Sequence, residues 1–91
     1  MEKSIYTDEY AALLELLQEA RRDAGLTQLQ LARRLGQSQS FVSKAEVGQR
    51  RLDVIQLRTI CALLGTTLEA FVKQLEERLA NSDLGTEKKL K

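Results

Sequence analysis

The feature that most constrains the fold is one glycine, Gly36, between two short segments that each have the pattern of an amphipathic helix. The segment before it, TQLQLARRLG (residues 27–36), starts with a threonine that can cap a helix, and a glutamine three residues later completes a capping box. The segment after it, SQSFVSKAEVG (residues 38–48), starts with a capping serine and ends in a second glycine. Because glycine readily adopts the left-handed conformation that stops a helix, this stretch predicts two helices joined by a tight turn.

The second of these helices has two different faces. Val42 and Ala45 are spaced to point inward, whereas polar residues occupy another face in i, i+4 pairs. The polar positions are Gln39, Ser40, Ser43 and Lys44. A solvated helix usually presents Glu and Lys, but this face carries an amide, two hydroxyls and one ammonium, which suit base edges and phosphates. Of the two interpretations, a solvated face and a DNA-contacting face, the glycine turn and the capped second helix favour the second.

Composition supports a single all-helical domain. The 91 residues are 43% hydrophobic, include no proline and have few aromatic side chains, a mix that favours helices over a sheet. One cysteine excludes an internal disulfide and suits a reducing compartment. No apolar run approaches the ~20 residues of a membrane span, and the N-terminus lacks the pattern of a signal peptide. We therefore expect a cytoplasmic protein.

The formal net charge of +1 hides an uneven distribution. Residues 1–20 contain one basic and five acidic side chains, whereas residues 21–58 contain eight basic and three acidic side chains. The positive charge therefore lies around the predicted pair of helices, where a phosphate backbone would be attracted.

Periodicity and capping signals divide the chain into five helices, predicted over residues 7–24, 28–35, 39–47, 54–64 and 67–80. Residues 1–6 are predicted to be a flexible lead and residues 81–91 a polar flexible tail, which leaves one domain over residues 7–80. The expected N-caps outside the central motif are Thr7, Asp53 and either Thr66 or Thr67.

Apolar stripes predict the buried faces of the other helices. In the first helix the stripe is Tyr10, Leu13, Leu14, Leu17 and Ala24. In the fourth it is Ile55, Leu57, Ile60, Cys61 and Leu64, and in the fifth it begins with Leu68, Phe71 and Val72. Leu75 and Leu79 continue the last stripe, and two interpretations remain open for them: packing on a second subunit, or packing back on the first helix.

Two kinds of charged residue are expected to be structural. Arg21 and Arg22 lie in the last turn of the first helix. There we expect them to compensate the negative end of the helix dipole and to be solvated. Glu46 ends the polar-faced helix. Because a carboxylate facing DNA would repel phosphate, we expect Glu46 to form a hydrogen bond or an ion pair with a nearby arginine.

The residues for enzyme chemistry are missing from the sequence. The chain contains no histidine, so Cys61 has no histidine to activate it and a zinc site cannot be assembled in the usual way. We expect Cys61 to be a small buried apolar residue, and we predict a protein that is not an enzyme and needs neither a cofactor nor a metal.

At the central motif the sequence resembles the helix-turn-helix of the Xre family, the phage-repressor-like regulators that include the lambda and 434 repressors and Cro. The resemblance covers about residues 14–72. The matching blocks are AGLTQ (24–28), LARRLG (31–36), SQSFVSKAEVG (38–48) and LLG (63–65). Several blocks at the family's spacing are more specific than a single short motif.

The resemblance implies roles for individual residues. Base contacts would come from Gln39, Ser40, Ser43 and Lys44, and phosphate contacts from Gln28, Gln49, Arg50 and Arg51. Phe41 is bulkier than the residue common at this position in the family, and it would either touch a thymine methyl group or shield the core. Gln37 replaces an apolar residue often found in the turn, which leaves the packing of the turn open.

The function that the resemblance implies is a sequence-specific regulator of transcription, more specifically a repressor. It would bind double-stranded DNA as a homodimer on a two-fold operator, with Leu75 and Leu79 at the dimer interface, and would exclude or recruit RNA polymerase. The alternative is a protein-binding module, such as an antitoxin-like partner that uses the last helix.

Overall fold

The computed structural model describes residues 7–81, and this part of the chain contains five α-helices and no strands. The helices are α1 (Asp8–Asp23), α2 (Gln28–Leu35), α3 (Gln39–Glu46), α4 (Val54–Leu63) and α5 (Leu68–Ala80). The predicted all-helical, five-helix fold is confirmed. No predicted boundary differs from the observed one by more than one residue, because the prediction counted capping residues as helical. The predictions for residues 1–6 and 82–91 lie outside the described residues.

Every helix begins after a residue whose side-chain oxygen accepts a hydrogen bond from the backbone N–H three positions later. These N-caps are Thr7, Thr27, Ser38, Asp53 and Thr67. α2 and α4 have complete capping boxes, in which Gln30 and Gln56 return a bond to the N-cap backbone. Such caps satisfy N–H groups that a helix cannot satisfy internally, so the local sequence determines where each helix starts.

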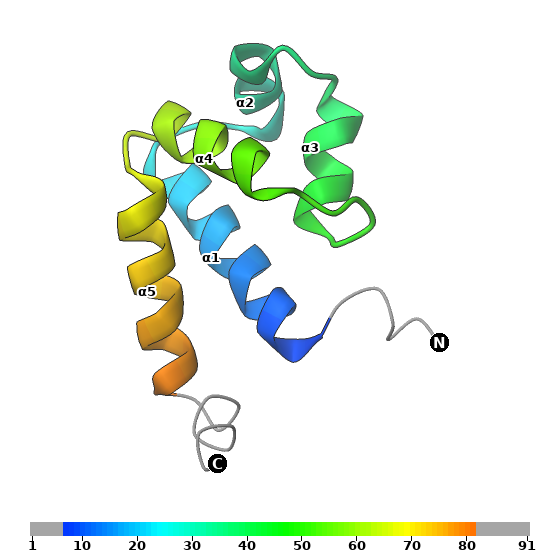
Figure 1. Ribbon diagram of the computed structural model, residues 1–91. Helices are drawn as coiled ribbons and strands as arrows, with labels where there is room; N and C mark the ends of the chain where they lie inside the picture. Colours follow the sequence, from blue (N-terminus) through cyan, green and yellow to red (C-terminus); the bar gives the residue numbers. More distant parts are fainter. Residues whose placement is uncertain (1–6, 82–91) are drawn as a thin grey trace.

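α1 lies between two groups of helices (Figure 1). α5 packs along one side of α1 and runs in the opposite direction, whereas α3 packs against the other side. α2 contacts both α3 and α4, and α4 in turn contacts α5. The core between them is formed by residues from all five helices: Leu16, Leu17, Leu31, Ala32, Phe41, Val42, Leu57, Ile60, Cys61 and Phe71. α3 therefore rests on a common core rather than on a single neighbour.

Some predictions of burial were wrong. Ile55 was expected in the core, but its side chain is 66% exposed. It precedes the buried Leu57 by two residues, which is a rotation of about 200° around a helix, so it faces away from the core. Val72 was also expected in the core and is exposed at the edge of the α5 stripe. Ala24 is exposed at the C-cap of α1, whereas Leu16, absent from the predicted stripe, is buried.

Cys61 is fully buried among apolar side chains of the core. Burial raises the pKa of its thiol, because desolvation disfavours the thiolate. The side chain therefore behaves as the small buried apolar residue that the sequence predicted, since a thiol kept protonated is a poor nucleophile.

No single helix within residues 7–81 is long and apolar enough to cross a membrane. α4 and α5 reach the required length and composition when taken together, but the two are bent by 104° at the break between them.

Candidate nucleic-acid interface

The turn between α2 and α3 depends on Gly36, whose φ of 75° lies in the left-handed region. The Gly36 N–H donates to the carbonyl oxygen of Arg33 at 3.2 Å, and the Gln37 N–H donates to that of Ala32 at 2.9 Å. These two bonds are the Schellman arrangement that closes a helix. A side chain at Gly36 would meet no atom within 4 Å, so its cost would be conformational, about 1–2 kcal/mol.

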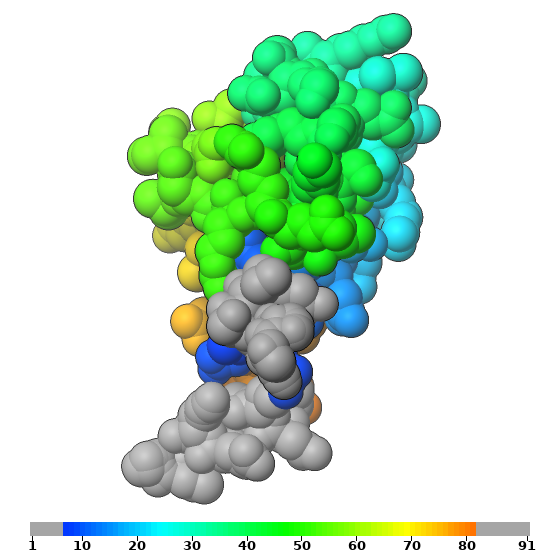
Figure 2. Space-filling view, turned by 90° about the vertical axis from the view of Figure 1, so that its right-hand side faces the viewer, coloured from blue at the N-terminus to red at the C-terminus, as the bar shows by residue number. Residues whose placement is uncertain are grey.

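α3 has the two faces that its sequence predicted. Its buried residues are Phe41, Val42, Ala45 and Glu46. The opposite side, which we call the recognition face, consists of the exposed Gln39, Ser40 and Lys44 and the half-buried Ser43. Figure 2 views the molecule from the side on which α3 lies in Figure 1, and α3 and the segment after it form a large part of that surface. The recognition face therefore offers hydrogen-bonding groups on the outer side of a helix, and the major groove of DNA is wide enough to admit a helix.

Glu46, the acidic residue of α3, points into the molecule and is almost fully buried. Its Oε2 accepts a hydrogen bond from Nε of Arg21 at 2.6 Å, and its Oε1 accepts bonds from Nη2 of Arg21 at 3.1 Å and Nε2 of Gln28 at 3.0 Å. Its backbone carbonyl accepts a bond from Nε2 of Gln18 at 2.8 Å. The expected ion pair of Glu46 with a nearby arginine is confirmed. We call these four residues the Glu46 network.

The network connects the C-terminal end of α3 to α1 and to the start of α2. Arg21 also donates from Nη1 to the carbonyl oxygen of Leu26 at 2.9 Å, in the segment between those two helices. Within residues 7–81, no buried side-chain nitrogen or oxygen lacks a hydrogen-bond partner. A buried polar network that is fully satisfied holds its members in one arrangement. The orientation of α3 is therefore specified by directional bonds as well as by apolar packing.

The prediction for Arg21 was wrong in one respect, because its side chain is buried rather than solvated. A signal was available in the sequence, since Leu14, Leu17 and Arg21 follow the i, i+3, i+7 spacing of one helix face. Arg21 was expected in solvent because of its positive charge. Arg22, the next residue, is exposed as expected and donates to the side chain of Gln18 at 3.3 Å.

The residues predicted to contact phosphate divide into two places. Gln28 lies in the first turn of α2, where its amide nitrogen binds Glu46. Gln49, Arg50 and Arg51, which we call the basic loop, follow α3 and are all exposed. The backbone N–H groups of Gln49 and Arg50 both donate to the carbonyl oxygen of Lys44, at 2.9 and 3.2 Å. The start of the basic loop is therefore fastened to the recognition helix itself.

Two aromatic rings lie under the arginines of the basic loop, a feature that the sequence analysis did not predict. Cζ of Arg50 is 4.7 Å from the ring centroid of Phe41, and Cζ of Arg51 is 4.4 Å from that of Tyr10. Phe41 is itself part of the core, which agrees with the shielding role that was one of its two predicted roles.

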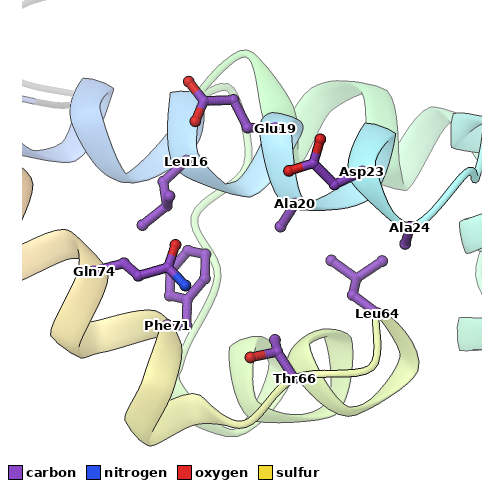
Figure 3. Close-up of a pocket in the computed structure, with 9 residues that line it drawn as sticks. All are labelled: Leu16, Glu19, Ala20, Asp23, Ala24, Leu64, Thr66, Phe71 and Gln74. Carbon is purple, nitrogen blue, oxygen red and sulfur yellow. The ribbon is translucent and has the colours of Figure 1, made fainter.

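The α1–α5 side of the molecule has a cleft of about 230 Å³. Figure 3 shows the apolar side chains of Leu16, Leu64 and Phe71 lining the space between the helices, and Glu19 and Asp23 on α1 with their carboxylates turned away from Phe71. The cleft is smaller than the roughly 300–1,000 Å³ of most small-molecule sites. It lies away from α3, and its carboxylates would repel phosphate, so the candidate interface is the α3 side.

The predicted dimer residues lie near the end of α5. Leu75 is half-buried and packs against the core of its own chain. Leu79 is half-buried too, in the last turn of the helix. Of the two open interpretations, packing within the chain accounts for part of Leu75, and the surface left for a second subunit is smaller than the sequence suggested.

Comparisons with known proteins agree with this geometry. The family model described as helix-turn-helix matches residues 17–71, which is more than half of the chain. A solved structure described as an XRE-family like protein from Pseudomonas syringae pv. tomato str. DC3000 is 51% identical, with a TM-score of 0.76. That match covers 85% of this chain and 94% of the other. No curated protein sequence gives a significant match.

Proposed function

We propose that this chain, which belongs to the Xre family of helix-turn-helix proteins, represses transcription as a homodimer on a two-fold symmetric DNA site. The coarser statement follows from the family: the chain is a DNA-binding transcription regulator and not an enzyme. The proposal adds the sign of regulation, the dimer, the symmetry of the site and the contacting residues. It also includes action in the cytoplasm and competition with RNA polymerase for the same DNA.

The observation that carries the proposal is the inward orientation of Glu46. Because the one carboxylate of α3 is buried against Arg21, the recognition face has only an amide, two hydroxyls and an ammonium. Gln39 suits a bidentate contact with adenine, and Ser40, Ser43 and Lys44 supply donors to neighbouring bases or phosphates. An acidic residue on that face would repel the backbone, so its removal to the interior supports a DNA-facing helix.

The basic loop and the start of α2 would bind phosphates on either side of the groove. Arg50 and Arg51 supply charge, and Gln49 supplies an amide beside them. The side-chain amide of Gln28 has two N–H donors. One of them binds Glu46, and the second would bind a phosphate. With Lys44, Arg50 and Arg51 each on one phosphate, a dimer makes about six charged contacts, and log K should change with log salt with a slope of about −5.

The experiment that tests this function is selection of bound duplexes from a random DNA pool with the full chain. We expect an enriched site made of two inverted half-sites about 10 base pairs apart, one turn of DNA. Gln39→Ala should relax the choice at one base pair in each half-site, at a cost of about 1–3 kcal/mol on the preferred site. Gln74→Ala is the matched control, because Gln74 is an exposed amide on α5.

Four results would count against the proposal. Enrichment of no sequence would contradict specific binding, and enrichment of a single unpaired site would contradict the dimer. Equal losses for Gln39→Ala on selected and random DNA would show that Gln39 contacts only the backbone. A promoter that the bound protein activates would contradict the proposed repression, but not the DNA binding.

The dimer interface is proposed at the exposed parts of Leu75 and Leu79. Because Leu75 also packs in its own core, Leu79→Glu is the cleaner variant, and we expect it to sediment as a folded monomer. Ile55→Glu, which changes an exposed apolar residue on α4, is the matched control and should stay dimeric. If instead Leu79→Glu stays dimeric and Ile55→Glu becomes monomeric, the interface lies on α4. A wild-type chain that is monomeric both free and on DNA would favour the alternative, a module that binds another protein.

A further inference from the structure

Each arginine of the basic loop lies over an aromatic ring from a different helix. Phe41 belongs to the first turn of α3, and its ring centroid is 4.7 Å from Cζ of Arg50. Tyr10 belongs to the first turn of α1, and its ring centroid is 4.4 Å from Cζ of Arg51. Both distances are within the ~6 Å over which a cation is attracted to the face of an aromatic ring.

The two rings are themselves held in place. Phe41 is 8% exposed and packs in the core. Tyr10 is half-buried, and its hydroxyl oxygen accepts a hydrogen bond from the backbone N–H of Leu52 at 3.4 Å. Tyr10 therefore contacts the loop twice, through its ring at Arg51 and through its hydroxyl at the next residue. A ring with a fixed position can fix what lies on it.

We propose that Tyr10 and Phe41 are positioning residues that hold Arg51 and Arg50 in place for binding DNA phosphates, an inference that rests on the proposed DNA-binding function. An arginine side chain loses much of its rotamer freedom when it is immobilised. An arginine already ordered on a ring loses less on binding, and the affinity rises by the difference. A cation–π contact is electrostatic and uses no hydrogen-bond acceptor, so it does not by itself prevent the N–H donors of a guanidinium from binding a phosphate.

The opposite interpretation is that the rings hold the arginines away from DNA. The two interpretations give opposite signs, because removing a positioning ring weakens DNA binding and removing a sequestering ring strengthens it. They also differ from a loss of charge. Removing a ring leaves the number of cations unchanged, so it should change the affinity without changing the salt slope.

The test uses the full chain and a duplex of random sequence, with affinities measured over a series of salt concentrations. Tyr10→Leu should weaken binding about 3- to 10-fold at every salt concentration, with the slope of wild type. Tyr10→Phe keeps the ring and should bind nearly as tightly as wild type. Arg51→Ala, the reference for a lost phosphate contact, should make the slope of a dimer shallower by about 2.

Phe41→Leu tests the second ring and its other predicted role together. If Phe41 positions Arg50, this variant weakens binding to all sequences about equally. If Phe41 instead touches a thymine methyl group, the loss appears only on sites that contain that thymine. Thermal melts of each variant, followed by circular dichroism, show the temperature range in which the variant is folded. The affinities are compared within that range.

A second readout separates positioning from general stability. In the free wild-type chain, ring currents should displace the side-chain proton resonances of Arg50 and Arg51 from their random-coil positions in NMR spectra. Tyr10→Leu should return only the resonances of Arg51 to their random-coil positions, and Phe41→Leu should return only those of Arg50. A Tyr10→Leu variant that is folded and loses this displacement but binds as tightly as wild type, or more tightly, would overturn the inference. If Arg51→Ala also leaves affinity and slope unchanged, the proposed phosphate contact fails instead.

Discussion

Two arginine–glutamate pairs connect α1 to its neighbours, one on each side of the helix. On the α3 side, Arg21 and Glu46 are 2.6 Å apart, with side chains only 10% and 3% exposed. On the α5 side, Arg78 and Glu19 are 2.7 Å apart, with side chains 34% and 48% exposed. The chemistry and the distance are nearly the same, and the burial is not.

Burial changes what each pair does for the protein. Exposed pairs contribute about 0–1 kcal/mol, because water and salt screen them and two long side chains lose freedom. A buried pair contributes little net stability against an apolar alternative, but removing one partner leaves an unpaired charge in the interior. On the α3 side, neither Arg21 nor Glu46 can be removed without leaving an unpaired charge in the interior. The α5 side depends instead on apolar residues such as Phe71 and Leu75. The helix that would meet DNA is the one with the stricter orientation.

The largest expected effect is that of Glu46→Ala. It leaves the buried guanidinium of Arg21 without its carboxylate, and we expect the free energy of unfolding to fall by about 3–5 kcal/mol. Since small domains have only about 5–15 kcal/mol in total, a substantial fraction of the variant would be unfolded on mild denaturation. Urea unfolding followed by circular dichroism measures the change. Glu19→Ala is the matched control, and equal losses in the two variants would contradict the comparison.

A second prediction concerns the pair as a unit. Replacing both partners, Arg21→Met with Glu46→Leu, should restore at least half of the stability lost by Glu46→Ala, because no unpaired charge remains. Recovery should be incomplete, since Gln28 and the carbonyl oxygen of Leu26 lose partners. A double-mutant cycle from urea unfolding gives the coupling. Strictly additive losses would show that the two residues act independently.

Gln28→Ala should have the next largest effect. The amide of Gln28 donates to a buried carboxylate, and hydrogen bonds to charged groups contribute about 1.5–3 kcal/mol. The loss should appear in the free protein, where no phosphate is present, and it separates the structural role of Gln28 from its proposed contact with DNA. Gln74→Ala, on the α5 side, should be close to neutral. A Gln28→Ala variant as stable as wild type would mean that the Glu46 network tolerates the loss of a donor.

The smallest effect is expected at the exposed pair. The hydrogen bond from Arg78 holds the pKa of Glu19 below its usual value, and the positive charge of Arg78 adds to this. A carboxyl group whose pKa is lowered by folding stabilises the protein above its ordinary pKa of about 4.3, and this contribution disappears as the pH falls through the folded-state pKa. Arg78→Ala should therefore melt slightly below wild type at pH 7 and low salt. The difference should vanish at high salt or at strongly acidic pH, and a difference that persists in both conditions would show that Arg78 acts through packing.

Much of this molecule could be predicted from short stretches of sequence. The five helices, their capping residues and the Gly36 turn depend on bonds between residues no more than five positions apart. The outward side of α3 was predicted from spacing alone, because Val42 and Ala45 define the buried side. Periodicity was less reliable near helix ends. Ile55, in the first turn of α4, was assigned to the core although its rotation from Leu57 faces it outward.

The sequence by itself determined where each helix begins and ends, because caps and glycine turns are local chemistry. It also determined that α3 carries hydrogen-bonding groups on one side. The tertiary structure decided which charges are buried and which rings lie under the basic loop. Glu46 is 25 residues from Arg21, and Arg51 is far along the chain from Tyr10. The stripe of Leu14 and Leu17 indicated the buried position of Arg21, but the partner of a buried charge is identified only when the helices pack.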